Sequence, residues 1–219
     1  SFSRREVNIS LLDARAGSPP TAGELLRRHS HDRGMEELRQ LFHEWERWSA
    51  DLLESHLSYP VLAYFRSQHD NLSWLEALTA ILDASAFVIV TLEGPCERQA
   101  QLTFAITRHA IVDLAQIFNC PPREPEQDRL PPYKLEALRS TLAATGMKLR
   151  EGSAVEQKLS ELRRMYEPYA TSLSQYMHIA IPPWMTEPGQ ADNWQTSAWG
   201  RRTGFQIDSL LDEPYDEHF

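Results

Sequence analysis

The chain has 219 residues and a formal net charge of −9, so it is long enough to bury a substantial hydrophobic core without a metal or a disulfide. An acidic surface of this kind argues against nucleic acid as a partner. The two cysteines, Cys96 and Cys120, lack Cys-x-x-Cys spacing and are expected to be reduced thiols.

The first 20 residues contain neither an initiating methionine nor an apolar signal core, so we expect a chain that is processed or is part of a longer protein. Residues 1–20 are predicted to be a linker, in which residues 7–12 could form a short strand. Helix starts follow from motifs of capping-box form, in which a hydroxyl and a carboxylate each accept a backbone N–H. These motifs are Thr21-x-x-Glu24, Ser73-x-x-Glu76 and Ser153-x-x-Glu156.

Three long helices are predicted between residues 21 and 119, which form the expected helical core. Apolar residues recur at three- and four-residue steps from about residue 35 to residue 57, before Pro60 breaks the helix. A second helix is expected over residues 73–93 and a third over residues 97–118, where the main apolar stripe is Leu102, Ile106, Ala110, Leu114 and Ile117. Because only two or three residues separate the last two helices, we expect them to pack as an antiparallel hairpin.

The second half of the chain is predicted to contain shorter helices between irregular segments. Residues 120–132 form a proline-rich linker that could separate two subdomains, and residues 133–181 form C-terminal helices with a kink at Pro168. Residues 182–219 form a tail without regular structure. The predicted fold class is all-α: a helical bundle built on the central antiparallel hairpin. The longest uncharged apolar run, residues 84–92, is far shorter than the roughly 20 residues of a membrane-spanning helix.

The densest group of polar side chains surrounds the predicted break at Pro60. Breaks between helices often line pockets, so this group is a candidate ligand site or, through its histidines, a pH-responsive contact. The alternative is a bend whose histidines make local hydrogen bonds and whose Asp and Asn form the turn. The candidate residues are Glu54, His56, Tyr59, Tyr64, Arg66, His69 and Asp70.

Two further pairs of residues are singled out by their positions. His109 and Asp113 stand four residues apart on the helix with the broadest apolar arc, which predicts a buried polar pair that fixes packing register rather than performing catalysis. Trp194 and Trp199 lie in a polar tail, where large aromatic side chains usually dock on their own domain or on a neighbour. Both tryptophans are therefore interface candidates.

The common catalytic and metal-binding patterns are not found. No histidine follows a glutamate at the Glu-x-x-His spacing of dinuclear metal bundles, and the sequence after His43 and Glu44 fails the zinc-protease pattern. The chain has no Gly-x-Ser-x-Gly elbow and no glycine-rich phosphate loop. We therefore predict no catalytic residue, no metal site and no cofactor.

Four segments resemble one family of bacterial ion-channel-like proteins, in which two transmembrane helices flank a pore loop of potassium-channel type and a long helical cytoplasmic region follows. The resemblance covers residues 2–202. The segments are SFSRREVNISLLDARAGSPPTAGELLRRH, WERWSADLLESHLSYPVLAYFRSQHDNLSWLEALTAILD, GPCERQAQLTFA and DNWQTSAWGRR.

The resemblance implies a placement and a role. Ser1 would follow the inner pore helix, and the chain would be a non-catalytic cytoplasmic domain on the inner face of the bacterial inner membrane, with regulation or assembly as its function. Its partners would be its own transmembrane pore and copies of itself, four in the full-length protein. The chain itself contains no Gly-Tyr-Gly filter sequence. The alternative is a free-standing all-α ligand-binding module or enzyme with a pocket near the Pro60 bend.

Overall fold

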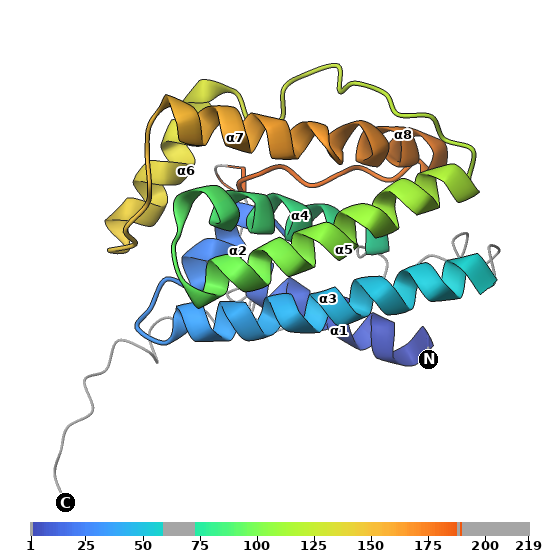
Figure 1. Ribbon diagram of the computed structural model, residues 1–219, viewed down its shortest axis with the longest axis horizontal. Coiled ribbons are helices and arrows are strands. Elements are labelled where there is room, and N and C mark those ends of the chain that lie inside the picture. Colours follow the sequence, from blue (N-terminus) through green and yellow to red (C-terminus); the bar gives the residue numbers. More distant parts are fainter. Residues whose placement is uncertain (1, 59–72, 188, 190–219) are drawn as a thin grey trace, which may run out of the picture. The chain divides into compact units, whose positions relative to one another are not determined.

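The computed structural model describes residues 2–58, 73–187 and 189, with the side chains of residues 2–6, 56 and 57 left aside. The chain divides into two units, Ser1–Thr186 and Glu187–Phe219, and all the helices described below belong to the first. Within the described residues the first unit is all-α and has no strand (Figure 1). Its helices are α1 (Phe2–Ala16), α2 (Ala22–Arg28), α3 (Gly34–Ser58), α4 (Trp74–Thr91), α5 (Pro95–Ile117), α6 (Pro132–Ala144), α7 (Ser153–Arg164) and α8 (Glu167–Met177).

The predicted all-α fold class is confirmed, and helix α4 lies in the interior of the unit. Helix α5 packs against α3 even more extensively than against α4, while α7 and α8 cover the opposite side of α4 and α5 (Figure 1). Helices α4 and α5 are joined by a short connection and contact each other. Their role as the central hairpin of a bundle stays a prediction.

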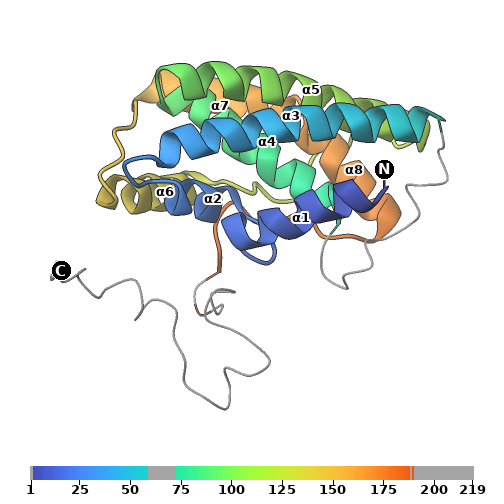
Figure 2. The same ribbon diagram turned by 90° about the horizontal axis from the view of Figure 1, so that it is seen from below.

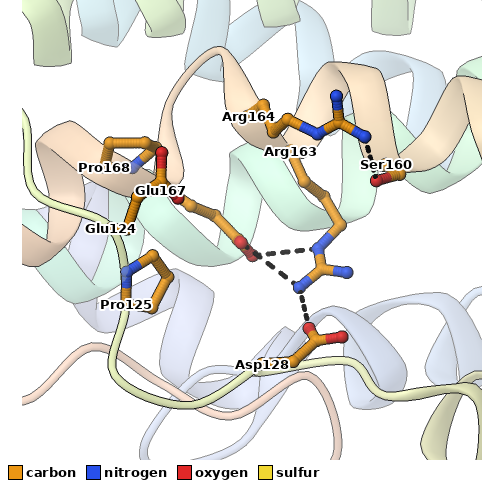
Figure 3. A pocket seen from close by; sticks show the side chains of 8 residues that line it. All are labelled: Glu124, Pro125, Asp128, Ser160, Arg163, Arg164, Glu167 and Pro168. Carbon is orange, nitrogen blue, oxygen red and sulfur yellow. Dashed lines mark hydrogen bonds and ion pairs between the residues drawn. The ribbon is translucent and has the colours of Figure 1, made fainter.

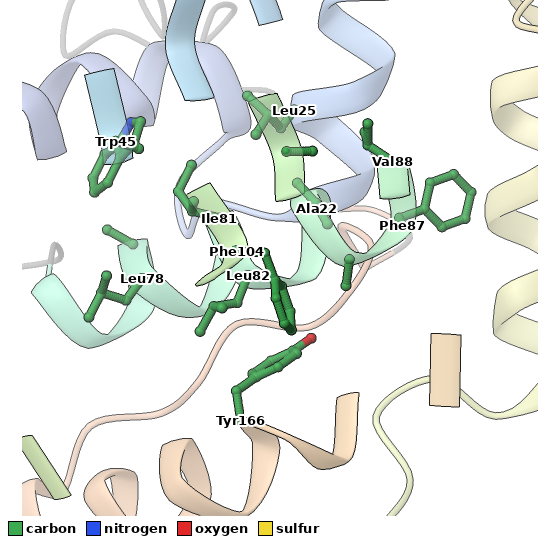
Figure 4. Packing of buried hydrophobic residues seen from close by; sticks show 14 of the residues in the cluster. Ala22, Leu25, Trp45, Leu78, Ile81, Leu82, Phe87, Val88, Phe104 and Tyr166 are labelled. Atoms are coloured by element: carbon green, nitrogen blue, oxygen red, sulfur yellow. The ribbon is translucent and has the colours of Figure 1, made fainter. Parts of the chain in front are cut away.

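Helix α4 is buried on almost every side, because 16 of its 18 residues are buried. Leu78, Ile81 and Leu82 point into the core, where the rings of Phe104 from α5 and Tyr166 make an edge-to-face contact with 5.9 Å between their centres (Figure 4). By length and composition α4 is the one described helix that could span a membrane, and 89% of it is buried inside the protein. Core helices have the same composition, so this property carries no argument about location.

The predicted short strand is wrong, because residues 7–12 belong to α1. Ile9, Leu12 and Ala16 are buried at helical spacing, whereas Val7 and Leu11 are about half exposed. Figure 2 shows α1 beside α2. The apparent alternation of apolar and polar residues was compatible with either structure over six residues. Burial of one helical face on α2, α3 and α4 selected the helix.

The three capping motifs behave differently. Ser73 forms a complete capping box with Glu76. Thr21 accepts the Glu24 N–H at 3.2 Å, but the Glu24 carboxylate binds arginines instead of completing the box. A helix does begin at Ser153, as predicted, but the capping box is wrong: Gly152 is the cap, with φ of 113°, and the expected partner Glu156 pairs with Arg139. In α2 and α7 the glutamate of the motif therefore pairs with arginine side chains and not with the cap.

The predicted stripe of α5 is only partly correct. Leu102 is 40% exposed and Ile106 is half-buried, whereas Thr103 and Thr107 are fully buried. The reason is that α5 faces α3 with hydroxyl groups that find partners across the interface: Ser49 bonds Thr107 at 2.9 Å, and Thr103 donates to the Phe42 carbonyl at 2.8 Å. A pattern of apolar residues alone does not detect such a face.

The proline-rich segment is irregular, as predicted, but it does not separate two compact units. Residues on both sides of it belong to the same unit, Ser1–Thr186. The Arg123 N–H donates to the Pro168 carbonyl at 3.0 Å, and Leu130 is buried. The predicted kink at Pro168 is a break: α7 ends at Arg164 and α8 begins at Glu167. Both cysteines are free and buried.

Candidate functional site

Asp83 on α4 is a fully buried carboxylate that is held by Arg129 from the proline-rich segment. The Arg129 guanidinium donates from Nη2 to Oδ2 at 2.6 Å and from Nη1 to Oδ1 at 3.1 Å, so the two groups meet in a bidentate pair. The Tyr166 hydroxyl also donates to Asp83. Two segments that are 46 residues apart in the sequence therefore meet at a single carboxylate.

Arg129 also binds two groups from the end of the helical unit. Its Nη1 lies 2.8 Å from Glu167 Oε1 at the start of α8, and its Nη2 donates to the Pro182 carbonyl at 2.7 Å. The neighbouring residues fix its position, because Asp128 accepts the Leu130 N–H at 3.0 Å in a local turn. A short polar turn thus places one guanidinium at the junction of α4, α8 and the segment after α8.

A second arginine extends these contacts towards the surface. Arg163 near the end of α7 donates to Glu167 at 3.1 and 3.2 Å and to Asp128 at 2.5 Å. Its guanidinium also lies 5.8 Å from the centre of the Trp184 ring. We call these groups the charge cluster: Asp83, Asp128, Arg129, Arg163, Tyr166 and Glu167.

The charge cluster contains three carboxylates and two guanidinium groups, a formal sum of −1. Burial raises the pKa of Asp83, and the nearby Arg129 opposes this shift only in part. Burial alone would lower the pKa of Arg129, but Asp83 raises it, so the guanidinium stays charged. Burial also raises the pKa of Tyr166, with Asp83 adding to the effect. Its phenol therefore stays a hydrogen-bond donor.

A small pocket of about 230 Å³ opens beside the outer end of the charge cluster. In Figure 3, Arg163 points across it towards Asp128 and Glu167, whereas Arg164 points away and donates to Ser160 at 3.1 Å. Most of the charged groups around the pocket are paired with one another. The lining residues are Glu124, Pro125, Asp128, Ser160, Arg163, Arg164, Glu167 and Pro168.

The polar side chains of the pocket and the charge cluster are charged and hydroxyl groups, most of which hydrogen-bond to one another. The pocket lining consists of carboxylates, guanidinium groups, one hydroxyl and two prolines, with no imidazole or thiol among them. Among the described residues, no group of three or more His, Cys, Asp or Glu side chains is placed to hold a metal ion. What the geometry does show is a set of charge-assisted hydrogen bonds that joins three parts of the fold.

The candidate site around Pro60 lies largely outside the described residues. Glu54 is described: it is exposed on α3 and accepts a hydrogen bond from Ser58 at 3.1 Å. His56 lies on α3, but its side chain is not described. Both interpretations of this site, a ligand pocket or a local bend, stay predictions. The candidates that fall outside the described residues are Tyr59, Tyr64, Arg66, His69 and Asp70.

His109 and Asp113 do form a pair, with 3.2 Å between Nε2 and Oδ2, but the prediction of a buried pair is wrong. The His109 side chain is 59% exposed and that of Asp113 is 27% exposed. The pair lies at the edge of α5, because Thr107, Ala110 and Leu114 occupy the buried face. The tail residues Trp194 and Trp199 lie outside the described residues, and their docking stays a prediction.

Sequence reasoning did not identify the charge cluster, although one signal was present. Asp83 lies within a long apolar stretch, and a charged residue there requires a partner if the stretch is buried. Arg129 gave no such signal, because it belongs to a polar, proline-rich segment that has the composition of a solvated linker. The pairing depends on contacts between residues 46 positions apart.

Comparisons with known proteins give no family or fold relative. No protein-family model, no curated protein and no solved structure matches this chain.

Proposed function

We propose that this chain is a non-catalytic cytoplasmic domain of a bacterial potassium-channel-like membrane protein, with a role in assembly or regulation of the pore. The observation that carries the proposal is the resemblance of four segments, spread over residues 2–202, to the cytoplasmic region of such proteins. The all-α fold supports it, because the cytoplasmic region of that family is helical.

The contacts of α1 would allow it to transmit movement of the proposed pore to the core of the domain. Ile9, Leu12 and Ala16 insert into the core, and the Thr21 N–H binds the Ala16 carbonyl at 2.8 Å. Helix α1 contacts α2, α3 and α4. In the proposed arrangement the inner pore helix precedes α1, so a displacement of that helix reaches the core through packed side chains.

Neighbouring residues of α1 provide a matched test. Leu12 is buried and Leu11 is 50% exposed, so Leu12→Asp should detach α1 while Leu11→Asp leaves it docked. We expect Leu12→Asp to change potassium flux or subunit crosslinking of the full-length protein in liposomes, and Leu11→Asp to leave both unchanged. Equal behaviour of the two variants would contradict coupling through α1.

The membrane connection itself has a separate test. The gene region immediately upstream of the Ser1 codon should encode two hydrophobic segments around a glycine-rich pore loop. A start codon next to the Ser1 codon would contradict the proposal. Crosslinking of the full-length protein in membranes should then give species up to a tetramer, the assembly that a pore of this type requires.

A further inference from the structure

The segment from Cys120 to Trp184, which we call the cover segment, lies over helices α2, α4 and α5. Its helix α6 contacts α2, α7 contacts α4, and α8 contacts α4 and α5. The Gly23 N–H also donates to the Trp184 carbonyl at 2.8 Å. A side chain at Gly23 would meet that carbonyl at 3.0 Å, so the approach of the two backbones is close.

The charge cluster is divided unequally between the cover segment and α4. Asp83 is its only member on α4. The cover segment supplies two guanidinium groups, from Arg129 and Arg163, and two carboxylates, from Asp128 and Glu167. These four charges sum to zero and are already paired within the cover segment.

Separation of the cover segment from α4 and α5 breaks polar contacts at two places, the Asp83 carboxylate and the end of α4. At the end of α4 the Arg150 N–H donates to the Thr91 carbonyl at 2.8 Å, and the partly exposed Arg150 guanidinium donates to the Ile89 and Leu92 carbonyls.

Arg129 loses Asp83 but keeps Glu167 and the Pro182 carbonyl, which belong to the same segment. Tyr166 loses Asp83 and its edge contact with Phe104. Asp83 regains water, which relieves the desolvation that raises its pKa in the closed form.

We propose that the cover segment opens away from α4 as one cooperative unit and that Arg129, through its bidentate pair with Asp83, makes the buried charged contact that holds it closed, whereas the contacts of Arg150 are partly exposed. Such opening is subglobal, because the interface between α3 and α5 does not take part in it. The device goes beyond the proposed function, since it concerns movement within the isolated chain. In a regulatory domain, the cover segment would be the part that moves in response to a signal.

Hydrogen exchange of the isolated 219-residue chain, followed by mass spectrometry, tests the proposal. In Arg129→Met we expect the amides of α7 and α8 to exchange faster by a common factor of at least about tenfold, with little change at the α3–α5 interface. The matched control is Arg164→Met, which removes an exposed arginine of the same segment that bonds only Ser160 among the contacts described. Equal acceleration in all helices, or no acceleration, would overturn the proposal.

Two further measurements test the proposal if Arg129→Met folds poorly. In the wild-type chain, low urea concentrations should reveal one shared opening of α7 and α8 with a smaller urea slope than the opening of α3 and α5. Independent opening of α7 and α8, or a single slope for all helices, would contradict the proposal. In Asp83→Asn/Arg129→Met, which removes both charges of the pair, exchange in the cover segment should return towards the wild-type rate. Neither measurement depends on the membrane connection.

Discussion

Two interfaces of the helical unit are both polar, but they use different chemistry. Between α3 and α5, the fully buried contacts are neutral hydrogen bonds of Ser49, Thr103 and Thr107, while the partly exposed Glu46 accepts a hydrogen bond from Gln99 at 2.6 Å. Between α4 and the cover segment, the buried contact is the ion pair of Asp83 and Arg129. A hydroxyl is satisfied by one partner and costs little to bury, whereas a buried charge needs a complete set of partners. The two interfaces should therefore respond very differently to the loss of one group.

The largest expected effect is the loss of the carboxylate at the charged interface. Asp83→Ala leaves the Arg129 guanidinium and the Tyr166 hydroxyl short of a partner in a buried site. We expect the free energy of unfolding to fall by about 3–5 kcal/mol, measured by urea denaturation. Asp113→Ala is the control: its pair with exposed His109 should contribute less than about 1 kcal/mol. Similar losses in both variants would remove the distinction between buried and exposed pairs.

One apolar residue beside each interface tests how strongly burial determines the stability cost of a substitution. Leu82 is fully buried on α4, so Leu82→Ala should lower the free energy of unfolding by about 2–5 kcal/mol. Ile106 on α5 is only half-buried, so Ile106→Ala should cost about 1 kcal/mol or less. Thermal and urea melts of both variants measure the difference. An equal cost would mean that Ile106 contributes to packing more than its exposure indicates.

A smaller effect is expected at the neutral interface. Thr103→Val keeps the shape of the side chain but removes the hydrogen bond to the Phe42 carbonyl and the longer one from Gln99 at 3.3 Å. We expect a loss of about 1 kcal/mol in urea denaturation. Thr141→Val is the control, because the exposed Thr141 hydroxyl bonds only the Ala137 carbonyl of its own helix among the contacts described. A loss for Thr103→Val as large as that for Asp83→Ala would show that neutral and charged interfaces are equally sensitive.

The smallest expected effect is a pH dependence that involves neither interface. His29 is 3% exposed and its Nδ1 lies 2.7 Å from the Leu25 carbonyl. Burial lowers its pKa below the ordinary 6.5, so the unfolded chain takes up the proton first as the pH falls. Its contribution to stability is therefore present above about pH 6.5 and decreases below it.

Urea denaturation at pH values on either side of 6.5 measures this dependence. Relative to His29→Asn, the wild-type chain should lose stability at the lower pH. His43→Asn is the control, since its exposed side chain makes only an ion pair with Glu46 among the contacts described. A pH slope unchanged by His29→Asn would contradict the assignment.

Prediction from the sequence succeeded where the signal is local. The capping box at Ser73 and the stripe from Leu38 to Leu52 describe α4 and α3 well, because caps and periodicity act within one or two turns. It failed for residues 7–12, where a six-residue pattern was ambiguous and tertiary packing selected a helix. It also failed for the burial of His109, because broad apolar arcs do not define the edge of a buried face.

By itself, the sequence determined the all-α fold class, most helix positions and the irregular course of residues 120–131, since propensity, caps and prolines act on neighbouring residues. The tertiary structure alone decided that Arg129 is buried and that Asp83 is its partner. Their pairing depends on a desolvated contact between distant segments, and the sequence near Arg129 is that of a solvated linker. Burial converts the same guanidinium from a solvated side chain into the group that joins α4, α8 and the segment at Pro182.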